Sequence, residues 1–160
     1  MGIKLSTPQS ALNAFFESAM TIIKREILIA YAKLGEESNA RIRDRSAEES
    51  WIDHTGNLRS SIGYAIFDYG IKQVESAFAS IGSGATGSQE GRKMIADLAK
   101  EYSRVYALVV VAAMNYADFV EAIESKDVLA STELWARSVV DGKLKLAVEK
   151  AISEINKIKL

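Results

Sequence analysis

The sequence predicts a single α+β domain, spanning 1–160, in which long helices accompany a small, mostly antiparallel sheet. Three patterns lead to this prediction. Apolar residues three and four positions apart follow the only proline, Pro8. β-Branched and aromatic residues run from Ile62 to Phe67 and end at a turn sequence. A second helical pattern begins near Ser131 and is expected to form a C-terminal helix packed on the sheet.

The expected N-terminal helical region covers 7–50. Thr7 supplies a capping oxygen, and proline at the first helical position loses no hydrogen bond. Apolar residues then recur at helical spacing over Leu12–Leu34. Gly35 is expected to interrupt the helix. The charged segment Glu36–Ser50 has little to bury, so it is expected to be a solvated continuation of the helix or a mobile arm.

The expected sheet region covers 51–122. Asp53–Gly56 has turn chemistry, because Asp can bond nearby backbone and Gly permits positive φ. A strand over Ile62–Phe67 should alternate its two faces, turn at Asp68–Gly70, and return as Val74–Phe78. The nearly continuous apolar run Tyr106–Met114 is typical of a strand covered on both faces, so it is predicted to be the central strand.

An insertion over 81–103 separates the hairpin from that strand. Ile81–Ser88 holds three glycines and is expected to be a flexible loop. Gln89–Ser103 has the spacing of a short helix, and Asp118–Glu121 that of a turn or a single helical turn. The C-terminal helix falls within 123–160, where Gly142 costs about 1 kcal/mol relative to Ala and predicts a bend or break.

Composition narrows the function. The chain has 20 Lys and Arg against 21 Asp and Glu, which gives no concentrated positive field for nucleic acid or an anionic membrane. Arg41, Arg43 and Arg45 occupy alternate positions but are surrounded by carboxylates. The absence of cysteine excludes disulfides, thiolate metal sites and a Cys nucleophile. No apolar stretch approaches the roughly 20 residues that a membrane helix needs, and no secretory segment is recognisable.

Two groups of titratable residues are candidates for acid–base catalysis or metal binding. His54, the only histidine, lies beside Asp53, but neighbouring side chains on an extended chain point in opposite directions. An ordinary turn residue is the better interpretation. Asp118, Glu121 and Glu124 would share a helix face, yet no other pattern supports acid–base or metal chemistry there. We therefore expect no catalytic residues and no metal site.

The spacing Gly82-x-Gly84-x-x-Gly87 matches a dinucleotide-binding fingerprint by letter. Its context does not match, because such a loop belongs to a parallel βαβ unit and this one follows a hairpin. It also ends in Gly87-Ser88-Gln89 and therefore lacks the lysine of a Walker loop. A surface loop without a cofactor is favoured. The alternative that stays open is a small ligand- or nucleotide-binding enzyme using the glycine loop 82–87 and His54.

Two short motifs carry a resemblance to a known family. Thr55-Gly56-Asn57-Leu58-Arg59-Ser60-Ser61-Ile62 resembles a Thr-Gly-x-Leu-x-x-Ser-Ile signature, and Asn115-Tyr116-Ala117-Asp118-Phe119-Val120-Glu121 resembles a Tyr-Ala-x-x-Val-Glu motif. The family comprises minor neck or tail-completion proteins, structural proteins at the head–tail connector of bacteriophages and prophages. The order of elements, from a long helix through the Thr-Gly motif to a C-terminal helix, is also similar.

The resemblance implies structural roles for the motif residues. Thr55 and Gly56 would turn the chain from helix to sheet. Leu58 and Ile62 would anchor the first strand in the core. Tyr116 and Val120 would pack the turn after the last strand, and Glu121 would cap or bond neighbouring backbone.

The resemblance also implies a function. The chain would be a non-enzymatic virion structural protein, assembled in the bacterial host cytoplasm as a homo-oligomeric ring that contacts other head or tail proteins. Segments 36–50 and 81–88 would contact neighbours and become ordered only on assembly. A membrane and sequence-specific nucleic acid are not expected partners. A further alternative is a helical adaptor that binds a host protein through the face over Leu12–Leu34.

Overall fold

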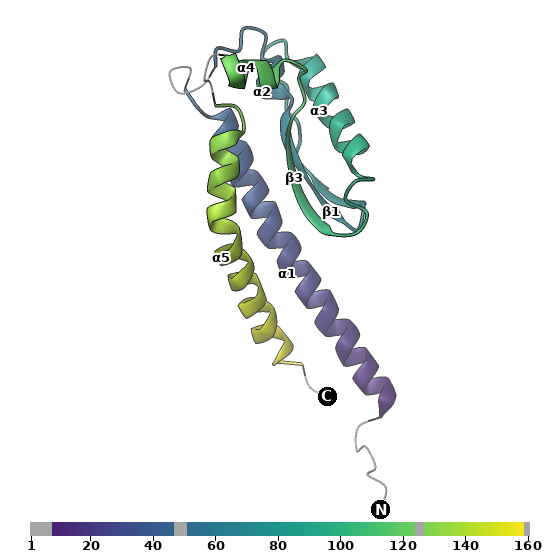
Figure 1. The fold of residues 1–160 in the computed structure, drawn as a ribbon. Helices are drawn as coiled ribbons and strands as arrows, with labels where there is room; N and C mark the ends of the chain where they lie inside the picture. Colours follow the sequence, from purple (N-terminus) through teal and green to yellow (C-terminus); the bar gives the residue numbers. More distant parts are fainter. Residues whose placement is uncertain (1–7, 47–50, 124–126, 159–160) are drawn as a thin grey trace, which may run out of the picture. The chain divides into compact units, whose positions relative to one another are not determined.

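The computed structural model describes residues 8–46, 51–123 and 127–158, and it confirms the α+β class (Figure 1). The chain contains a long N-terminal helix, a three-stranded antiparallel sheet, an inserted helix and a C-terminal helix. In order, the elements are α1 (Gln9–Arg43), α2 (Asn57–Ser60), β1 (Ile62–Asp68), β2 (Ile71–Glu75), α3 (Ala85–Leu98), β3 (Tyr106–Ala112), α4 (Ala117–Ile123) and α5 (Ala130–Ile155).

The chain forms two compact units. The first combines the residues up to Ala30 with those from Val140 onward, and the second is Tyr31–Val139. Helices α1 and α5 contribute to both units.

The first unit is a pair of helices that buries mainly small side chains. Apart from Glu26, the buried residues in the described part of this unit are alanines: Ala19, Ala30, Ala147 and Ala151. Glu26 binds Lys150 at 2.9 Å and Arg25 at 3.1 Å, and Arg25 also pairs with Glu154. The pKa of Glu26 lies below its ordinary value, chiefly because Lys150 donates a hydrogen bond to the carboxylate. Burial acts to raise this pKa, and the hydrogen bond from Arg25 lowers it further. Ion pairs and small residues therefore join the two helices.

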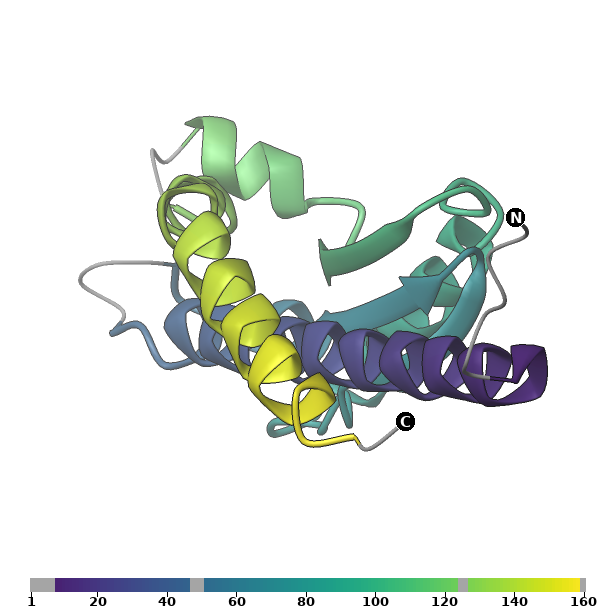
Figure 2. The same cartoon turned by 90° about the horizontal axis from the view of Figure 1, so that it is seen from below.

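The second unit contains the sheet, in the order β2-β1-β3. The predicted turn is confirmed, because Tyr69 and Gly70 join β1 to β2 with φ values of 50° and 83°. The prediction that Tyr106–Met114 is the central strand is wrong. In the sheet β3 is an outer strand (Figure 2). Every residue of β1 is buried, whereas the residues of β3 are mostly half-buried. An apolar run indicates that both faces of a strand are covered, but it does not indicate whether the strand has a neighbour along each of its edges.

The return strand also differs from prediction. It spans Ile71–Glu75 instead of Val74–Phe78, and most of its residues are exposed. Such a strand lacks the apolar alternation that a sequence pattern detects. Phe78 lies beyond it with φ of +44° and is fully buried. Its ring fills the space over Gly63 and Gly91, where a Cβ at either position would lie 2.4 Å from ring atoms.

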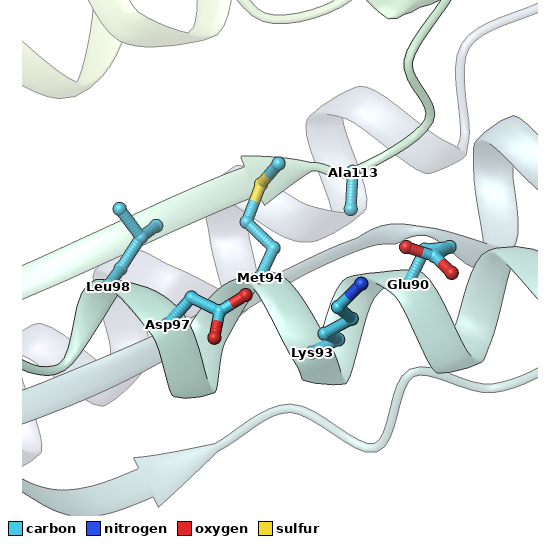
Figure 3. Close-up of a pocket in the computed structure, with 6 residues that line it drawn as sticks. All are labelled: Glu90, Lys93, Met94, Asp97, Leu98 and Ala113. Atoms are coloured by element: carbon cyan, nitrogen blue, oxygen red, sulfur yellow. The ribbon is translucent and has the colours of Figure 1, made fainter.

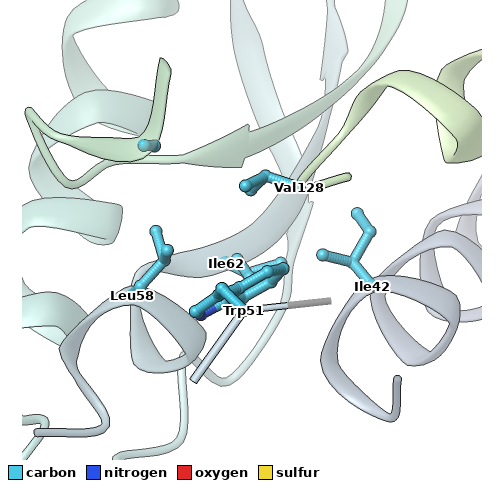
Figure 4. Packing of buried hydrophobic residues seen from close by; sticks show 6 residues of the cluster. Ile42, Trp51, Leu58, Ile62 and Val128 are labelled. Carbon is cyan, nitrogen blue, oxygen red and sulfur yellow. The ribbon is translucent and has the colours of Figure 1, made fainter. Parts of the chain in front are cut away.

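The alternation predicted for β1 is confirmed, and each face of the sheet has its own apolar cluster. One face contributes to a cluster formed by Ile42, Trp51, Leu58, Ile62, Ala117 and Val128 (Figure 4). The other face contributes to a cluster formed by Ala65, Phe67, Phe78, Ile95, Val109 and Val111. Helix α3 supplies Ile95 and covers this second face.

Helix α1 does not end at Gly35, contrary to prediction. A Cβ at Gly35 would lie 2.5 Å from the ring of Tyr64, so glycine lets this ring pack directly against the helix. The following charged segment is helical up to Arg43, and it buries Ser38, Asn39 and Ile42. The segment is therefore a continuation of the helix that is solvated over most of its described residues but has one buried side. Residues 47–50 of the predicted arm lie outside the described residues.

Helix α5 runs continuously through Gly142, so the predicted break there is wrong. A Cβ at Gly142 would meet nothing within 4 Å. The residue occupies an open helix surface and serves no close approach.

Candidate functional site

Asp53 organises the turn that contains the first motif. Its Oδ1 accepts a hydrogen bond from the Gly56 amide at 2.9 Å, and its Oδ2 accepts one from the Arg59 amide at 2.8 Å. The Thr55 hydroxyl oxygen accepts from the Asn57 amide at 3.2 Å. Gly56 has φ of +78°, a conformation that glycine adopts without strain. The carboxylate thus satisfies amides at the start of α2 that would otherwise lack partners.

His54 lies exposed in this turn. Both carboxylate oxygens of its neighbour Asp53 are occupied by backbone amides. The two residues therefore do not form the hydrogen-bonded base and orienting carboxylate that general-base catalysis requires. No hydrogen bond links His54 to any other described residue.

The two motifs, far apart in sequence, meet in space. A hydrogen bond joins the side chains of Thr55 and Tyr116. Burial raises the pKa of Tyr116, the charge of Asp53 raises it further, and the Thr55 hydrogen bond acts in the opposite direction. Leu58 and Ile62 are buried in the first cluster, against which Tyr116 and Val120 pack. Residues from both motifs thus form one structural junction.

Glu121, at the end of the second motif, contacts the start of α5. Its Oε1 accepts a hydrogen bond from the Ala130 amide at 2.9 Å. Ala130 is the first residue of that helix, whose amide has no partner within the helix. Glu121 therefore contributes to the helix start, which is a structural role.

Arg45 holds the same helix start from another direction. It donates to the Asp127 carbonyl at 2.8 Å, the Ser131 hydroxyl at 2.7 Å and the Thr132 hydroxyl at 2.8 Å. It also forms an ion pair with the Asp127 carboxylate at 2.5 Å. Burial acts to raise the pKa of Asp127, but hydrogen bonds from Ser131 and the charge of Arg45 outweigh it and hold that pKa below its ordinary value.

The other two arginines of the predicted arm are also engaged within the chain. Arg41 stacks over the Trp135 ring at 4.5 Å, and Arg43 donates to the Ala79 carbonyl at 2.9 Å. The expectation that this segment becomes ordered only on assembly is therefore wrong for its described part, up to residue 46. Sequence reasoning missed these contacts because the partners of Arg45 lie 82 to 87 positions away, where local periodicity carries no signal.

The glycine segment is not a flexible loop. Helix α3 begins at Ala85 and ends at Leu98, so the predicted bounds of both the loop and the helix are wrong. Gly84 and Gly87 are buried against the first motif. A Cβ at Gly87 would lie 1.9 Å from the Asn57 carbonyl oxygen, and one at Gly84 would lie 2.5 Å from that of Gly56. The glycines allow α2 and α3 to approach each other at the level of the backbone.

A phosphate-binding loop needs amides that face an open site. Here the Gly87 amide donates to the Asn57 side chain at 3.1 Å, and the Ser88 amide donates to the Gly84 carbonyl at 3.1 Å. The Gly84 amide donates to the Ile81 carbonyl at 2.9 Å. The match to the dinucleotide spacing therefore coincides with a packing role.

The acidic residues give no grouped site either. Asp118 is exposed in the first turn of α4, and Glu124 lies outside the described residues. Within the ranges that the structure describes, no three His, Cys, Asp or Glu side chains gather as metal ligands would.

An open pocket of 360 Å³ lies between α3 and the end of β3 (Figure 3). Five of its lining residues come from α3, and Ala113 closes it at the end of the strand: Glu90, Lys93, Met94, Asp97, Leu98 and Ala113. Its lining is part apolar and part charged. Sequence patterns did not indicate this pocket, because it is defined by the packing of α3 beside β3.

The fold and this junction define an α+β protein with two compact units. Comparison with protein-family models, curated proteins and solved structures finds no match to the chain. In the described part of the chain, no helix combines the length and apolarity required to span a membrane.

Proposed function

We propose that the chain is a structural subunit of the head–tail junction of a tailed bacteriophage or prophage, a neck or tail-completion protein that acts without catalysis in a ring of identical copies. The observation that carries the proposal is the junction of the two motifs. Leu58 and Ile62 from the first motif meet Tyr116 and Val120 from the second at a single apolar cluster, and a hydrogen bond joins the side chains of Thr55 and Tyr116. Both motifs serve to connect helices to the sheet.

The first unit supports assembly with other chains. Among its described residues no large apolar side chain is buried, although large apolar residues are frequent on both of its helices. On α1, Phe16 and Met20 are 61% and 64% exposed, and on α5, Val148 and Ile152 are 45% and 52% exposed. Each pair is four residues apart and therefore lies on one side of its helix. Contiguous apolar surface of this kind commonly marks a protein interface.

Two measurements test the proposal. The genes that flank the coding sequence should include those for a portal, capsid or tail-tube protein. The purified chain, measured by sedimentation and native mass spectrometry alone and with tail components, should form a closed homo-oligomer. A metabolic operon around the gene, or a monomer under every assembly condition, would contradict the proposal.

The exposed residues of α1 also favour a second candidate, a helical adaptor that binds a host protein. Phe16, Met20 and Ile29 leave part of the face over Leu12–Leu34 uncovered. An adaptor would stay monomeric alone and form a complex of one copy each with its partner. A ring would form from the chain itself, so solution mass distinguishes the two candidates.

A further inference from the structure

We propose that the outer edge of β3 and the adjoining pocket on α3 form a binding site for an extended segment of a partner protein, which adds to the sheet as a fourth strand. The proposal concerns a site that the motif junction does not use. It does not depend on the head–tail assignment.

The hydrogen-bond pattern of the sheet leaves the outer side of β3 available. Ala113 donates to the Ser61 carbonyl, and Tyr69 donates to the Val105 carbonyl, so odd-numbered residues on this strand bond to β1. In an antiparallel ladder the intervening residues direct their backbone groups the other way. Leu108, Val110 and Ala112 therefore point their amides and carbonyls outward. Among the described residues no strand pairs with that side.

The strand also lacks the features that normally prevent pairing at an edge. Natural edge strands are often protected by charged residues, proline or a bulge. The sequence YALVVVA contains neither charge nor proline, and its pairing with β1 is regular throughout. Seven residues give enough length for an added strand.

The pocket lies where the side chains of an added strand would point. Ala113 continues the alternation of Val109 and Val111, which face α3. Ala113, which directly follows β3, is the lining residue that does not belong to α3, so the pocket lies beside the end of the outer strand. An added strand would thus bond to β3 through its backbone and place every second side chain against α3, a known mode of peptide recognition.

The residues of α3 indicate which side chains fit. Glu90 lies at the Ala113 end of the pocket and Leu98 at the other, with Met94 between them (Figure 3). Met94 offers an apolar contact, while the carboxylates of Glu90 and Asp97 outnumber the ammonium group of Lys93. The partner should therefore present one apolar and two basic side chains to the helix.

Helix and strand geometry sets the spacing. From Glu90 to Asp97 the helix rises about 10 Å, at 1.5 Å per residue. Positions i and i+4 of a strand are about 13 Å apart, and i and i+2 about 7 Å. Lysine side chains are long enough to absorb this difference. The expected segment has the pattern basic-x-apolar-x-basic, with its central residue over Met94 and its basic residues beside Glu90 and Asp97.

The test uses the full chain and the peptide acetyl-Thr-Lys-Thr-Val-Thr-Lys-Thr-amide. Amide exchange followed by NMR should show slowed exchange at Leu108, Val110 and Ala112 when the peptide is added. A peptide with Glu in place of Lys should bind about tenfold more weakly. A peptide N-methylated at alternate amides, which cannot complete the ladder, should give no slowing.

Variants separate the charge effect from the backbone effect. Glu90→Lys combined with Asp97→Lys should reverse the preference in favour of the Glu peptide. Glu101→Lys, exposed and outside the pocket, makes the same type of charge change and should leave the preference unchanged.

Three results would overturn the proposal. One is unchanged exchange at the three β3 amides with saturating peptide. Another is equal binding of the N-methylated peptide. The third is slow exchange in the free chain that becomes fast on dilution, because a second copy would then cover the edge.

Discussion

Asn57 and Gly87 contact each other through both side chain and backbone. The Gly87 amide donates to Asn57 Oδ1 at 3.1 Å, and the Asn57 carbonyl oxygen lies 1.9 Å from where a Gly87 Cβ would be. This contact joins the first motif to α3. It explains why a glycine occupies the interior of a helix, where alanine would be favoured by about 1 kcal/mol.

Gly87→Ala should therefore destabilise the protein. The added methyl group meets fixed backbone, so the clash should exceed the gain in helix propensity and lower the free energy of unfolding by about 2 kcal/mol. Chemical denaturation measures this change. Gly142→Ala is the matched control, because nothing lies within 4 Å of its Cβ, and it should stabilise by up to about 1 kcal/mol. Equal effects of the two substitutions would contradict the proposed close approach.

Gly35→Ala tests a second close approach, in which the obstacle is a side chain. The new Cβ would lie 2.5 Å from the Tyr64 ring, whose hydroxyl donates to Glu36 at 2.7 Å. We expect a loss of about 2 kcal/mol in the native background. In a Tyr64→Leu background the same substitution should be neutral or stabilising, since the obstacle is smaller. Additive effects in a double-mutant cycle measured by denaturation would show that the ring does not cause the loss.

Features of the fold that depend on neighbouring residues were predictable from the sequence, whereas features that depend on distant residues were not. The two long helices, α1 and α5, and the hairpin turn at Tyr69 were predictable because periodicity and turn chemistry act within a few residues. The order of the strands was not predictable. The three valines of β3 indicate that the faces of this strand are covered, but they do not indicate its position in the sheet. Gly35 was assigned to a helix interruption and Gly87 to a flexible loop, because their packing partners, Tyr64 and Asn57, lie far along the chain.

The candidate site shows the same division. Turn chemistry at Asp53 and Gly56 was recognisable from residue types alone, and a backbone contact for Glu121 was expected from the resemblance. The contacts of Arg45 with the start of α5 had no local signal, because charge patterning made its segment look solvated. The unpaired edge of β3 could not be predicted from the sequence, because it follows from the order of the strands.

Asp53→Ala should destabilise the turn before α2. Its carboxylate accepts hydrogen bonds from two backbone amides, and loss of such a cap costs about 1–2 kcal/mol. His54→Ala, at the adjacent exposed position, should change stability by less than about 0.5 kcal/mol. Thermal and urea denaturation of the two variants provide the comparison. A larger effect at His54 than at Asp53 would indicate that the histidine has a role that its exposure does not explain.

Asp127 should make stability depend on pH. Burial opposes its ionisation, but Ser131 and Arg45 more than compensate, so its pKa in the folded protein lies below the ordinary 3.8. For a lowered pKa, the stabilisation is complete above the unfolded value and is lost as pH falls through the folded value. Asp127→Asn should therefore cost about 1–2 kcal/mol at pH 7 and nothing below the folded pKa.

Denaturation of both proteins across pH 2 to 7, a range of about five units, measures this difference. Asp141→Asn, at an exposed position in α5, is the control and should give a curve parallel to that of the native chain. If the gap between Asp127→Asn and the native chain is constant down to the lowest pH, the ion pair with Arg45 is not its origin.

Substitution of exposed apolar residues on the first unit should weaken assembly. Phe16→Glu with Met20→Glu places two charges on a surface that a neighbouring chain would bury, and an unpaired buried charge is strongly unfavourable. Both side chains are mostly exposed within one chain, so folding should be unaffected. We expect the association constant to fall by about a hundredfold or more, because a loss of 1.4 kcal/mol already corresponds to a factor of ten.

Sedimentation equilibrium measures the association constant, and circular dichroism checks folding. Leu134→Glu, also highly exposed but in the second unit, is the control. If this control weakens assembly while the double variant does not, the interface lies elsewhere and the apolar pairs on α1 and α5 do not form it.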